Sequence, residues 1–418
     1  MPKTPSALPA PVTLPGRHPP PGDLHSAAVR RLLLATALLA LILPAVASAR
    51  RTVPQGWMGM VVNRDRLGTP AHADTEWSRM VSTGVESVRS PFVWARAQPD
   101  DPAGGSSLPR DRFGVPTDFS DSDDVVAATA RRGLPVLPVV IQAPTWAAAD
   151  PGDNLPHPKD ARDYAHYVTD LVERYGPNGT FWTEHPELPR RPIRAWQVWN
   201  EPNIPYFWHG PWLKGYRALL VAAHNAIKAA DPGAKVVLGA FSNAAHAVAW
   251  RSLGELYKTR VRGLFDQVAV HPYTLLPKNV LRSSRYVRDV MRRYGDGRKP
   301  LLITELSWPS TNDNRGHNRT DHNYGFNVTE RQQAQKITEV YRLLAKARRS
   351  LGITAVYWYT WVSVDRGRTD PFDYAGLRTV GSPSSDSRAK PAFYAWRRAV
   401  LSLEGCRRGA KSSVTRCG

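Results

Sequence analysis

Short apolar runs alternate with longer amphipathic stretches along the chain from residue 52 onward. The apolar runs are rich in β-branched and aromatic residues and have the length of buried β-strands. Eight of them occur, at Trp57–Val62, Val85–Val93, Leu134–Ile141, Ala195–Trp199, Lys235–Phe241, Phe265–Val270, Leu301–Thr304 and Ile353–Trp361. The pattern therefore predicts eight strands, each buried on both faces.

The stretches between these runs carry the signals of helix ends. A capping-box sequence, Thr329-Glu330-Arg331-Gln332, opens a helix that is expected to run to Arg349. Glycine or an Asp-Pro-Gly sequence directly follows the other helical patterns. These cover Asp123–Arg132, Ala161–Tyr175, Tyr216–Ala230 and Ser283–Tyr294. Helices therefore separate the predicted strands.

Strands that alternate with helices form a parallel sheet, and eight such strands close a (β/α)8 (TIM) barrel. The chain is thus expected to be α/β, with one barrel domain at residues 50–404. A doubly wound open sheet is the alternative, but no Gly-rich phosphate loop follows the first strand.

Both ends of the chain lie outside this pattern. Arg30-Arg31, the apolar run Leu32–Val46 and Ala47-Ser48-Ala49 have the layout of a signal peptide with cleavage near Ala49. Residues 1–49 are therefore expected to direct secretion, with an N-terminal membrane anchor as the alternative. In the tail, residues 405–418, an exported protein could join Cys406 to Cys417 in a disulfide.

A formal net charge of +20 indicates either a solvated Arg-rich surface or attraction to an anionic cell envelope or acidic polysaccharide. Nucleic acid is not an expected partner, because no basic helix is interleaved with aromatic residues. The 14 Trp residues are numerous enough for some to stack on sugar rings and others to fill the core. Oligomeric state leaves no signal in the sequence.

Two glutamates end predicted strands beside a tryptophan. The fourth strand leads into Trp199-Asn200-Glu201-Pro202-Asn203, and the seventh leads into Thr304-Glu305 before Trp308. Catalytic groups of a barrel enzyme lie at the carboxyl ends of the strands, so the two carboxylates are expected to meet in one pocket. Paired carboxylates are the groups that cleave a glycosidic bond by acid/base chemistry.

The other strand ends carry side chains suited to holding a sugar. Arg89 belongs to the second strand, Trp146 follows the third, and His271 and Tyr273 end the sixth. Asn200 precedes the first glutamate, and the last two strand ends offer Trp308, Trp358 and Trp361. Together with the glutamates, these residues predict a carbohydrate site.

In this combination the motifs resemble clan A glycoside hydrolases, the cellulase-like (β/α)8 barrels of families 5 and 39. Asn200-Glu201-Pro202 resembles the acid/base motif of the clan, and Thr304-Glu305 resembles its nucleophile motif. Arg89 matches the arginine that supports the nucleophile, and His271-Pro272-Tyr273 matches a His-x-Tyr of the sixth strand. The likeness covers Trp57 to Leu401.

The resemblance implies a secreted retaining glycosidase that cleaves a poly- or oligosaccharide by double displacement. Glu305 would attack the anomeric carbon, and Glu201 would be the acid/base, with its pKa raised by the charge of its neighbour. Asn200 would bind the 2-hydroxyl of the substrate, and either Trp358 or Trp361 would form the floor of the sugar site. Transglycosylation shares all these residues.

A non-catalytic glycan-binding or cell-envelope barrel is the alternative, and its expected mark is the loss of one carboxylate. Neither Glu201 nor Glu305 is lost. No cofactor is implied.

A metal-dependent hydrolase is disfavoured, because the first and fifth strands end in Asn63 and in Ser242-Asn243 and not in His or Asp ligands. The Asp and His residues between Thr311 and Val328 likewise show no diagnostic ligand spacing.

Overall fold

The computed structural model describes residues 51–243, 247–311, 327–364, 370–380 and 387–405. Within them, one parallel sheet has the strand order β5-β4-β3-β2-β1-β9-β8-β7-β6. Its strands are β1 (Met58–Val61), β2 (Ser87–Val93), β3 (Val136–Ile141), β4 (Ala195–Val198), β5 (Lys235–Leu238), β6 (Phe241–Ser242), β7 (Val268–His271), β8 (Leu301–Ile303) and β9 (Ile353–Trp358). Each of the eight predicted strands is present.

The strands β5 and β6 are two parts of one barrel strand. β5 pairs with β4 on one side and β6 pairs with β7 on the other, and a parallel bridge joins Val237 to Gln267. Gly239 lies at the interruption, where a Cβ would come within 2.8 Å of the carbonyl oxygen of Val198. The sheet therefore closes on itself with eight strand positions, as a (β/α)8 barrel does.

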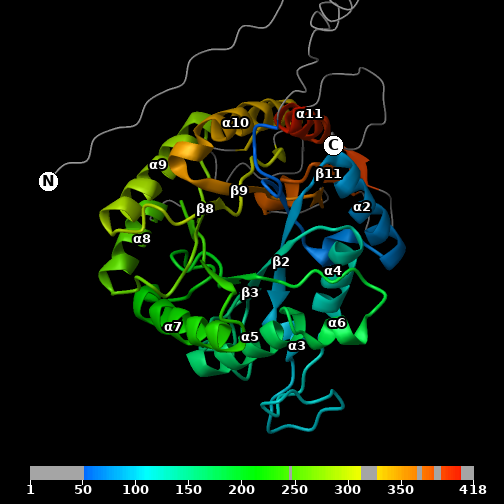
Figure 1. Ribbon diagram of the computed structural model, residues 1–418, viewed down its shortest axis with the longest axis vertical. Coiled ribbons are helices and arrows are strands. Elements are labelled where there is room, and N and C mark those ends of the chain that lie inside the picture. The colour runs from blue at the N-terminus through cyan, green and yellow to red at the C-terminus, as the bar shows by residue number, and fades with distance from the viewer. Residues whose placement is uncertain (1–50, 244–246, 312–326, 365–369, 381–386, 406–418) are drawn as a thin grey trace, which may run out of the picture. The chain divides into compact units, whose positions relative to one another are not determined.

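Helices surround the barrel (Figure 1). The longer ones are α2 (Pro70–Thr83), α4 (Ser120–Arg131), α5 (Ala161–Tyr175), α7 (Trp212–Ala230), α8 (Ala249–Lys258), α9 (Pro277–Arg293), α10 (Glu330–Leu351) and α11 (Pro391–Glu404). The capping box at the start of α10 is formed, because the Thr329 hydroxyl accepts from the backbone of Gln332 and the Gln332 side chain accepts from the backbone of Thr329.

The remaining elements are short. They are the helices α3 (Trp94–Ala97) and α6 (Thr180–Glu184), the 3-10 turns η1 (Arg64–Leu67) and η3 (Pro371–Tyr374), and a small sheet of β10 (Val362–Ser363), β11 (Arg378–Thr379) and β12 (Arg388–Ala389). β10 follows the last barrel strand and pairs with β11, so this sheet ties the closing segment of the chain to one end of the barrel.

Apolar side chains form two layers. A small cluster fills the barrel interior and includes Val61, Leu137, Val237, Leu302 and Tyr357. Gly59 leaves room for Tyr357, since a Cβ there would lie 2.4 Å from the ring. A much larger cluster lies between strands and helices and contains most of the buried tryptophans. The alternation of side chains along each strand separates the two layers.

The signal peptide, its cleavage near Ala49 and the Cys406–Cys417 disulfide lie outside the described residues. Where the chain is described, no helix combines the length and apolarity needed to cross a membrane. The predicted barrel domain, residues 50–404, contains all the described strands and helices, and α11 ends at Glu404.

Candidate active site

The backbone at the end of β4 directs Asn200 and Glu201 toward the barrel mouth. Trp199 and Glu201 have φ angles of 66° and 41°, in the left-handed region that non-glycine residues rarely adopt. Gln142, directly after β3, has a φ of 63°. Such conformations cost about 1–3 kcal/mol each and concentrate at functional sites. The surrounding fold therefore holds the backbone in rarely populated conformations directly after β3 and β4.

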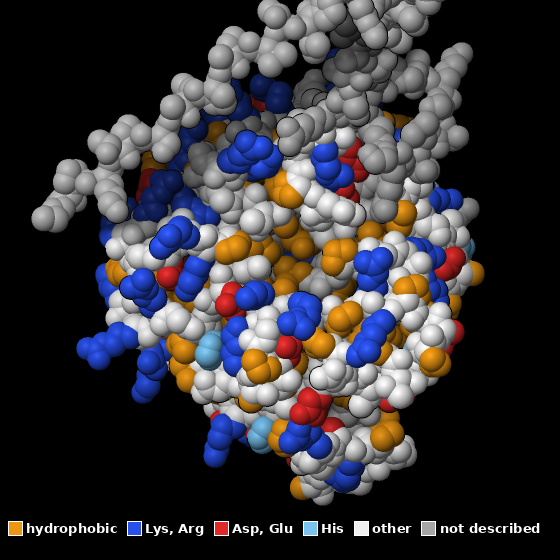
Figure 2. Space-filling view, viewed as in Figure 1, with side chains coloured by type: hydrophobic (Ala, Val, Ile, Leu, Met, Phe, Trp, Pro, Cys, Tyr) orange, Lys and Arg blue, Asp and Glu red, His pale blue; other side chains and the backbone are white. Residues whose placement is uncertain are grey.

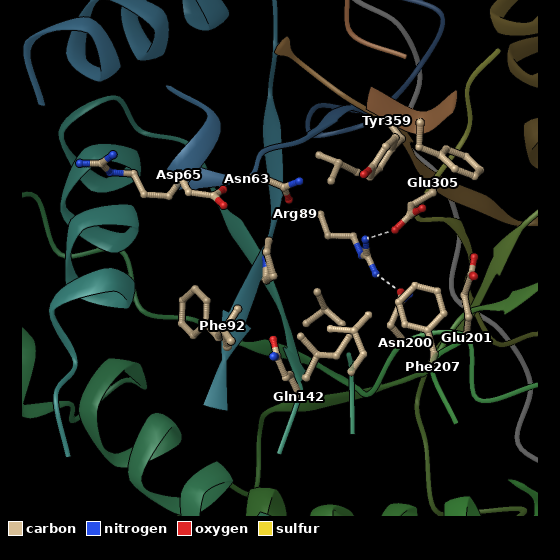
Figure 3. Close-up of a pocket in the computed structure, with 18 of the residues that line it drawn as sticks. Asn63, Asp65, Arg89, Phe92, Gln142, Asn200, Glu201, Phe207, Glu305 and Tyr359 are labelled. Atoms are coloured by element: carbon tan, nitrogen blue, oxygen red, sulfur yellow. Dashed lines mark hydrogen bonds and ion pairs between the residues drawn. The ribbon is translucent and has the colours of Figure 1, made fainter. Parts of the chain in front are cut away.

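Glu305, after β8, is held at both carboxylate oxygens. Arg89 of β2 donates from Nη1 to Oε1 at 2.7 Å, and the Tyr273 hydroxyl donates to Oε2 at 2.7 Å. The remaining nitrogens of Arg89 donate to Asn200 Oδ1 and to Gln197 Oε1, each at 2.7 Å. Arg89 is only 2% exposed, so one buried guanidinium joins three strand ends (Figure 3). This fixes the orientation of the Glu305 carboxylate.

Glu201 has a different environment. It is 7% exposed, and burial raises its pKa to about 7, against the opposing effects of the Ser242 hydroxyl and the Arg89 charge. The sequence-based expectation of a raised pKa is met, but its main cause is burial and not the charge of Glu305. A carboxyl group with this pKa carries a proton at mildly acidic pH and can release it near neutrality.

His271 lies beneath Glu201, with Nδ1 at 2.5 Å from the Glu201 Oε1 and Nε2 at 3.0 Å from the Thr304 hydroxyl. Burial lowers the pKa of His271 to about 3, and Arg89 lowers it further while Glu305 raises it. The ring is therefore neutral. A neutral ring protonated on Nδ1 donates to Glu201 and accepts a hydrogen bond from Thr304 on Nε2.

The two carboxylates meet in one pocket. Ligand-type atoms of Glu201, His271 and Glu305 all lie within 4.8 Å of one another. Three such groups could in principle hold a metal ion, but the Arg89 guanidinium already neutralises Glu305 and Tyr273 occupies its second oxygen. A divalent cation would be repelled by that guanidinium, so the donor set fits acid/base chemistry better than metal binding. A second group, Asp150, Asp153 and His209, lies on the surface.

A cavity of about 870 Å³ extends from the carboxylates across the ends of β2 and β3. Figure 3 shows Glu201, Glu305 and Arg89 at one side, and Asp65, Phe92 and Gln142 farther along. Aromatic rings line much of it, namely Phe92, Tyr167, Tyr206, Phe207, Tyr273, Tyr359 and Phe372. The size is within the range of ligand pockets, and rings of this kind pack against the apolar faces of sugars.

Four of the predicted sugar-binding residues are tryptophans that lie away from the cavity. Trp308, Trp358 and Trp361 have no exposed surface, and Trp146 is half-buried against the core; among the described residues, none of the four lines the cavity. Their indole nitrogens donate to Thr274 O, Ala375 O, Glu76 Oε2 and Gln98 O, respectively. These indole groups therefore hold neighbouring loops and helix α2 in place, and none of them lines the cavity.

The inward positions of the last strand belong to tyrosines instead. Tyr357 packs in the barrel interior and Tyr359 lines the cavity, whereas Trp358 between them faces the helix layer. Alternation along the run Tyr357-Trp358-Tyr359 was available from the sequence and places the two tyrosines on one face of the strand and Trp358 on the other.

Other supporting residues were not predicted. Gln197 is a buried polar residue in an otherwise apolar strand, and it accepts from Arg89 Nε and donates to Leu238 O at 3.1 Å. Asn203 donates to Ser242 O at 2.9 Å and so ties the loop after β4 to β6. The signal for Gln197 was its polarity inside a buried run.

Comparison with known proteins gives one family match. Residues 192–395 match the model of glycosyl hydrolase family 53, a span that contains Glu201, His271, Tyr273 and Glu305 but not Arg89. No curated protein matches the chain.

Many solved structures share the fold. A family 39 glycoside hydrolase from Bacteroides cellulosilyticus WH2 superposes with a TM-score of 0.59 at 19% identity, over 86% of this chain and 66% of that one. A monomeric β-xylosidase from Caulobacter crescentus CB15 gives 0.55 at 18% identity, covering 84% and 69%. The family 53 catalytic domain from Ignisphaera aggregans gives 0.52 at 17% identity, covering 85% and 98%. The chain thus spans about two thirds of the first two proteins and nearly all of the third.

At these identities the solved structures establish the fold alone, a (β/α)8 barrel, and the family match adds the type of activity. Together they support the resemblance to clan A glycoside hydrolases seen in the sequence: the chain has their fold, and residues 192–395 match one glycosyl hydrolase family.

Proposed function

We propose that the protein is a retaining glycosidase, with Glu305 as the nucleophile and Glu201 as the acid/base. One observation carries the proposal: the nearest oxygens of the two carboxyl groups lie within 4.8 Å of each other. Retaining glycosidases hold their carboxyl groups about 5–5.5 Å apart, whereas inverting enzymes leave about 6.5–9.5 Å for a water molecule.

The surroundings of each carboxyl group support its assigned role. Glu305 attacks the anomeric carbon as a carboxylate, which Arg89 and Tyr273 hold in place. Glu201, with its pKa of about 7, gives its proton to the leaving oxygen. The resulting glycosyl-enzyme then reacts with water, from which Glu201 removes a proton, and both carboxyl groups return to their starting states.

Asn200 is placed to bind the sugar at the reacting carbon. Its side-chain oxygen accepts from Arg89, so its amide N–H groups remain to donate toward the cavity. A hydrogen bond from that amide to the substrate 2-hydroxyl would strengthen as positive charge develops on the ring.

The substrate is proposed to be a neutral poly- or oligosaccharide. Six acidic side chains line the cavity, of which Glu201 carries the catalytic proton, but only four guanidinium groups do, although the whole chain has a net charge of +20. The acidic residues are Asp65, Asp118, Asp121, Glu201, Glu305 and Asp370, and the basic ones are Arg64, Arg66, Arg89 and Arg96. This excess of negative charge disfavours an acidic sugar at the reaction centre.

Secretion remains a proposal that rests on the N-terminal sequence, with Arg30-Arg31 before the apolar run and Ala47-Ser48-Ala49 after it. Microscopy or fractionation of cells that produce the full chain would test it. A mature protein that begins near Arg50 in the medium supports secretion, and a full-length chain in the membrane fraction supports an anchor.

Covalent trapping tests the mechanism. A panel of 2-deoxy-2-fluoroglycosides, one for each common neutral sugar, is incubated with the protein, and the labelled peptide is mapped by mass spectrometry. Label on Glu305 is expected, with loss of turnover in Glu305→Gln and full turnover in the exposed control Glu187→Gln. Unchanged turnover in Glu305→Gln, or inversion of the anomeric configuration by NMR, would refute the proposal.

A further inference from the structure

Positive charge is concentrated on one side of the helix ring. Helix α9 contains six Lys or Arg residues and one Asp, and α10 contains six Lys or Arg and two Glu. Across the barrel, α4 contains one Arg and three Asp, and α5 contains two Arg and three acidic residues. Figure 2 shows Lys and Arg side chains gathered along the edge that α8 and α9 occupy in Figure 1. The net charge of the chain is therefore not spread evenly.

The arginines on the two sides also differ in their partners. Near α4 and α5, Arg64 pairs with Asp124, Arg132 with Asp74 and Arg174 with Asp123. On α8 and α9, by contrast, no carboxylate of the described residues lies within ion-pair distance of the exposed Arg251, Arg282, Arg285 and Arg293. Unpaired guanidinium groups that are exposed together remain available to an external anion.

An aromatic pair lies among these arginines. The rings of Trp250 on α8 and Tyr286 on α9 are 4.9 Å apart between centroids, and Tyr286 is 44% exposed. Arg282 and Arg293 precede and follow Tyr286 by four and seven residues, which places all three on one face of the helix. Arg251 is the next residue after Trp250. The surface thus combines ring faces with flanking guanidinium groups.

We propose that the outer face of α8 and α9 is a second carbohydrate-binding surface, which takes an acidic polysaccharide. Pyranose rings would stack on Tyr286 and Trp250, and carboxylates along the polymer would bind Arg251, Arg282, Arg285 and Arg293. A lipid headgroup layer offers negative charge without flat sugar rings on which Tyr286 and Trp250 could stack, and the vesicle measurement below distinguishes it from a polysaccharide. The acid-rich cavity disfavours the same acidic units, and this face is therefore an anchoring site separate from the reaction centre.

Binding at this face needs neither catalytic carboxylate, so it can be tested apart from turnover. The full chain carrying Glu305→Gln is titrated with polygalacturonate in low salt, and the dissociation constant is compared with that of the same chain carrying Arg282→Glu and Arg285→Glu. The matched control reverses two exposed arginines elsewhere, Arg131→Glu and Arg162→Glu, which changes the net charge equally. We expect the first pair to weaken binding by about tenfold or more and the control pair by less than about twofold.

A second variant, Tyr286→Ala, separates stacking from charge. It should weaken binding to polygalacturonate and leave binding to inorganic polyphosphate unchanged. Equal loss in both arginine pairs, or no effect of Tyr286→Ala, overturns the proposal. Tighter binding to phosphatidylglycerol vesicles or to double-stranded DNA than to polygalacturonate also overturns it. With Glu305 intact, the Arg282→Glu, Arg285→Glu chain should hydrolyse a small aryl glycoside at the rate of the unaltered chain, so failure here is distinguishable from failure of the proposed mechanism.

Discussion

Replacing Glu201 by Gln tests the acid/base assignment, because glutamine keeps the shape of the side chain but cannot give up a proton. Burial raises the pKa of Glu201 to about 7, so the carboxyl group is about 90% protonated at pH 6 and about 10% protonated at pH 8. Only the protonated form can assist the leaving group. For the unaltered protein, kcat/KM should therefore fall by about tenfold per pH unit above pH 7.

The size of the loss in Glu201→Gln depends on the substrate. For a leaving group that needs a proton, loss of general acid catalysis lowers the rate by about 10²–10⁴-fold, which corresponds to about 3–5 kcal/mol in the activation free energy. A dinitrophenolate leaves without protonation, so its release from the sugar should be nearly unaffected. The variant then accumulates the glycosyl-enzyme, because the water that hydrolyses it has lost its base.

The assay compares an alkyl glycoside with a dinitrophenyl glycoside of the same sugar between pH 5 and 9. We expect a burst of dinitrophenolate from Glu201→Gln, a large loss on the alkyl glycoside and no decline of its residual rate above pH 7. Equal losses on both substrates, or a variant that still loses activity above pH 7, would show that another group is the acid.

Three further changes probe the surroundings. His271→Phe removes the 2.5 Å hydrogen bond that favours the ionised form of Glu201. The pH above which kcat/KM declines should therefore rise. If that pH does not change, His271 does not donate this hydrogen bond to Glu201. Arg89→Met leaves the Glu305 carboxylate without its buried partner and should lower the free energy of unfolding by about 3–5 kcal/mol, measured by urea titration against Arg131→Met. Burial, assisted by the nearby Asp111 carboxylate, raises the pKa of Asp170 to about 9. Because this folded-state pKa lies above the unfolded value, the carboxyl group favours folding most below about pH 4, and that contribution is lost as pH rises toward 9. Asp170→Asn should therefore raise the melting temperature more at pH 8 than at pH 4, and an equal gain at both would show that Asp170 is not protonated in the fold.

Much of the fold follows from local sequence. The apolar runs are strands because they are too short for buried helices and are bounded by turns, and helix α5 spans the predicted residues Ala161–Tyr175. Helix α10 begins after Thr329, as its capping box indicates. Glu201 and Glu305 could be singled out because each follows such a run directly, and any barrel gathers strand ends at one mouth.

Local sequence could not decide which side chains point into that mouth. Either Trp358 or Trp361 was expected to face the sugar, but Tyr359 lines the cavity and both tryptophans are buried away from it. Alternation along the strand separates Trp358 from Tyr357 and Tyr359, but only the register of the closed sheet determines which of the two sets faces inward.

The contacts that distinguish the two carboxyl groups also depend on the tertiary structure. Arg89 and Gln197 belong to two strands, Glu305 follows a third, and the pKa of Glu201 rises because the folded barrel buries it. Sequence by itself therefore determined the elements and the chemical groups at their ends, since those depend on neighbours along the chain. Orientation, burial and the separation of the carboxylates were decided by the tertiary structure, because they depend on residues that only barrel closure brings together.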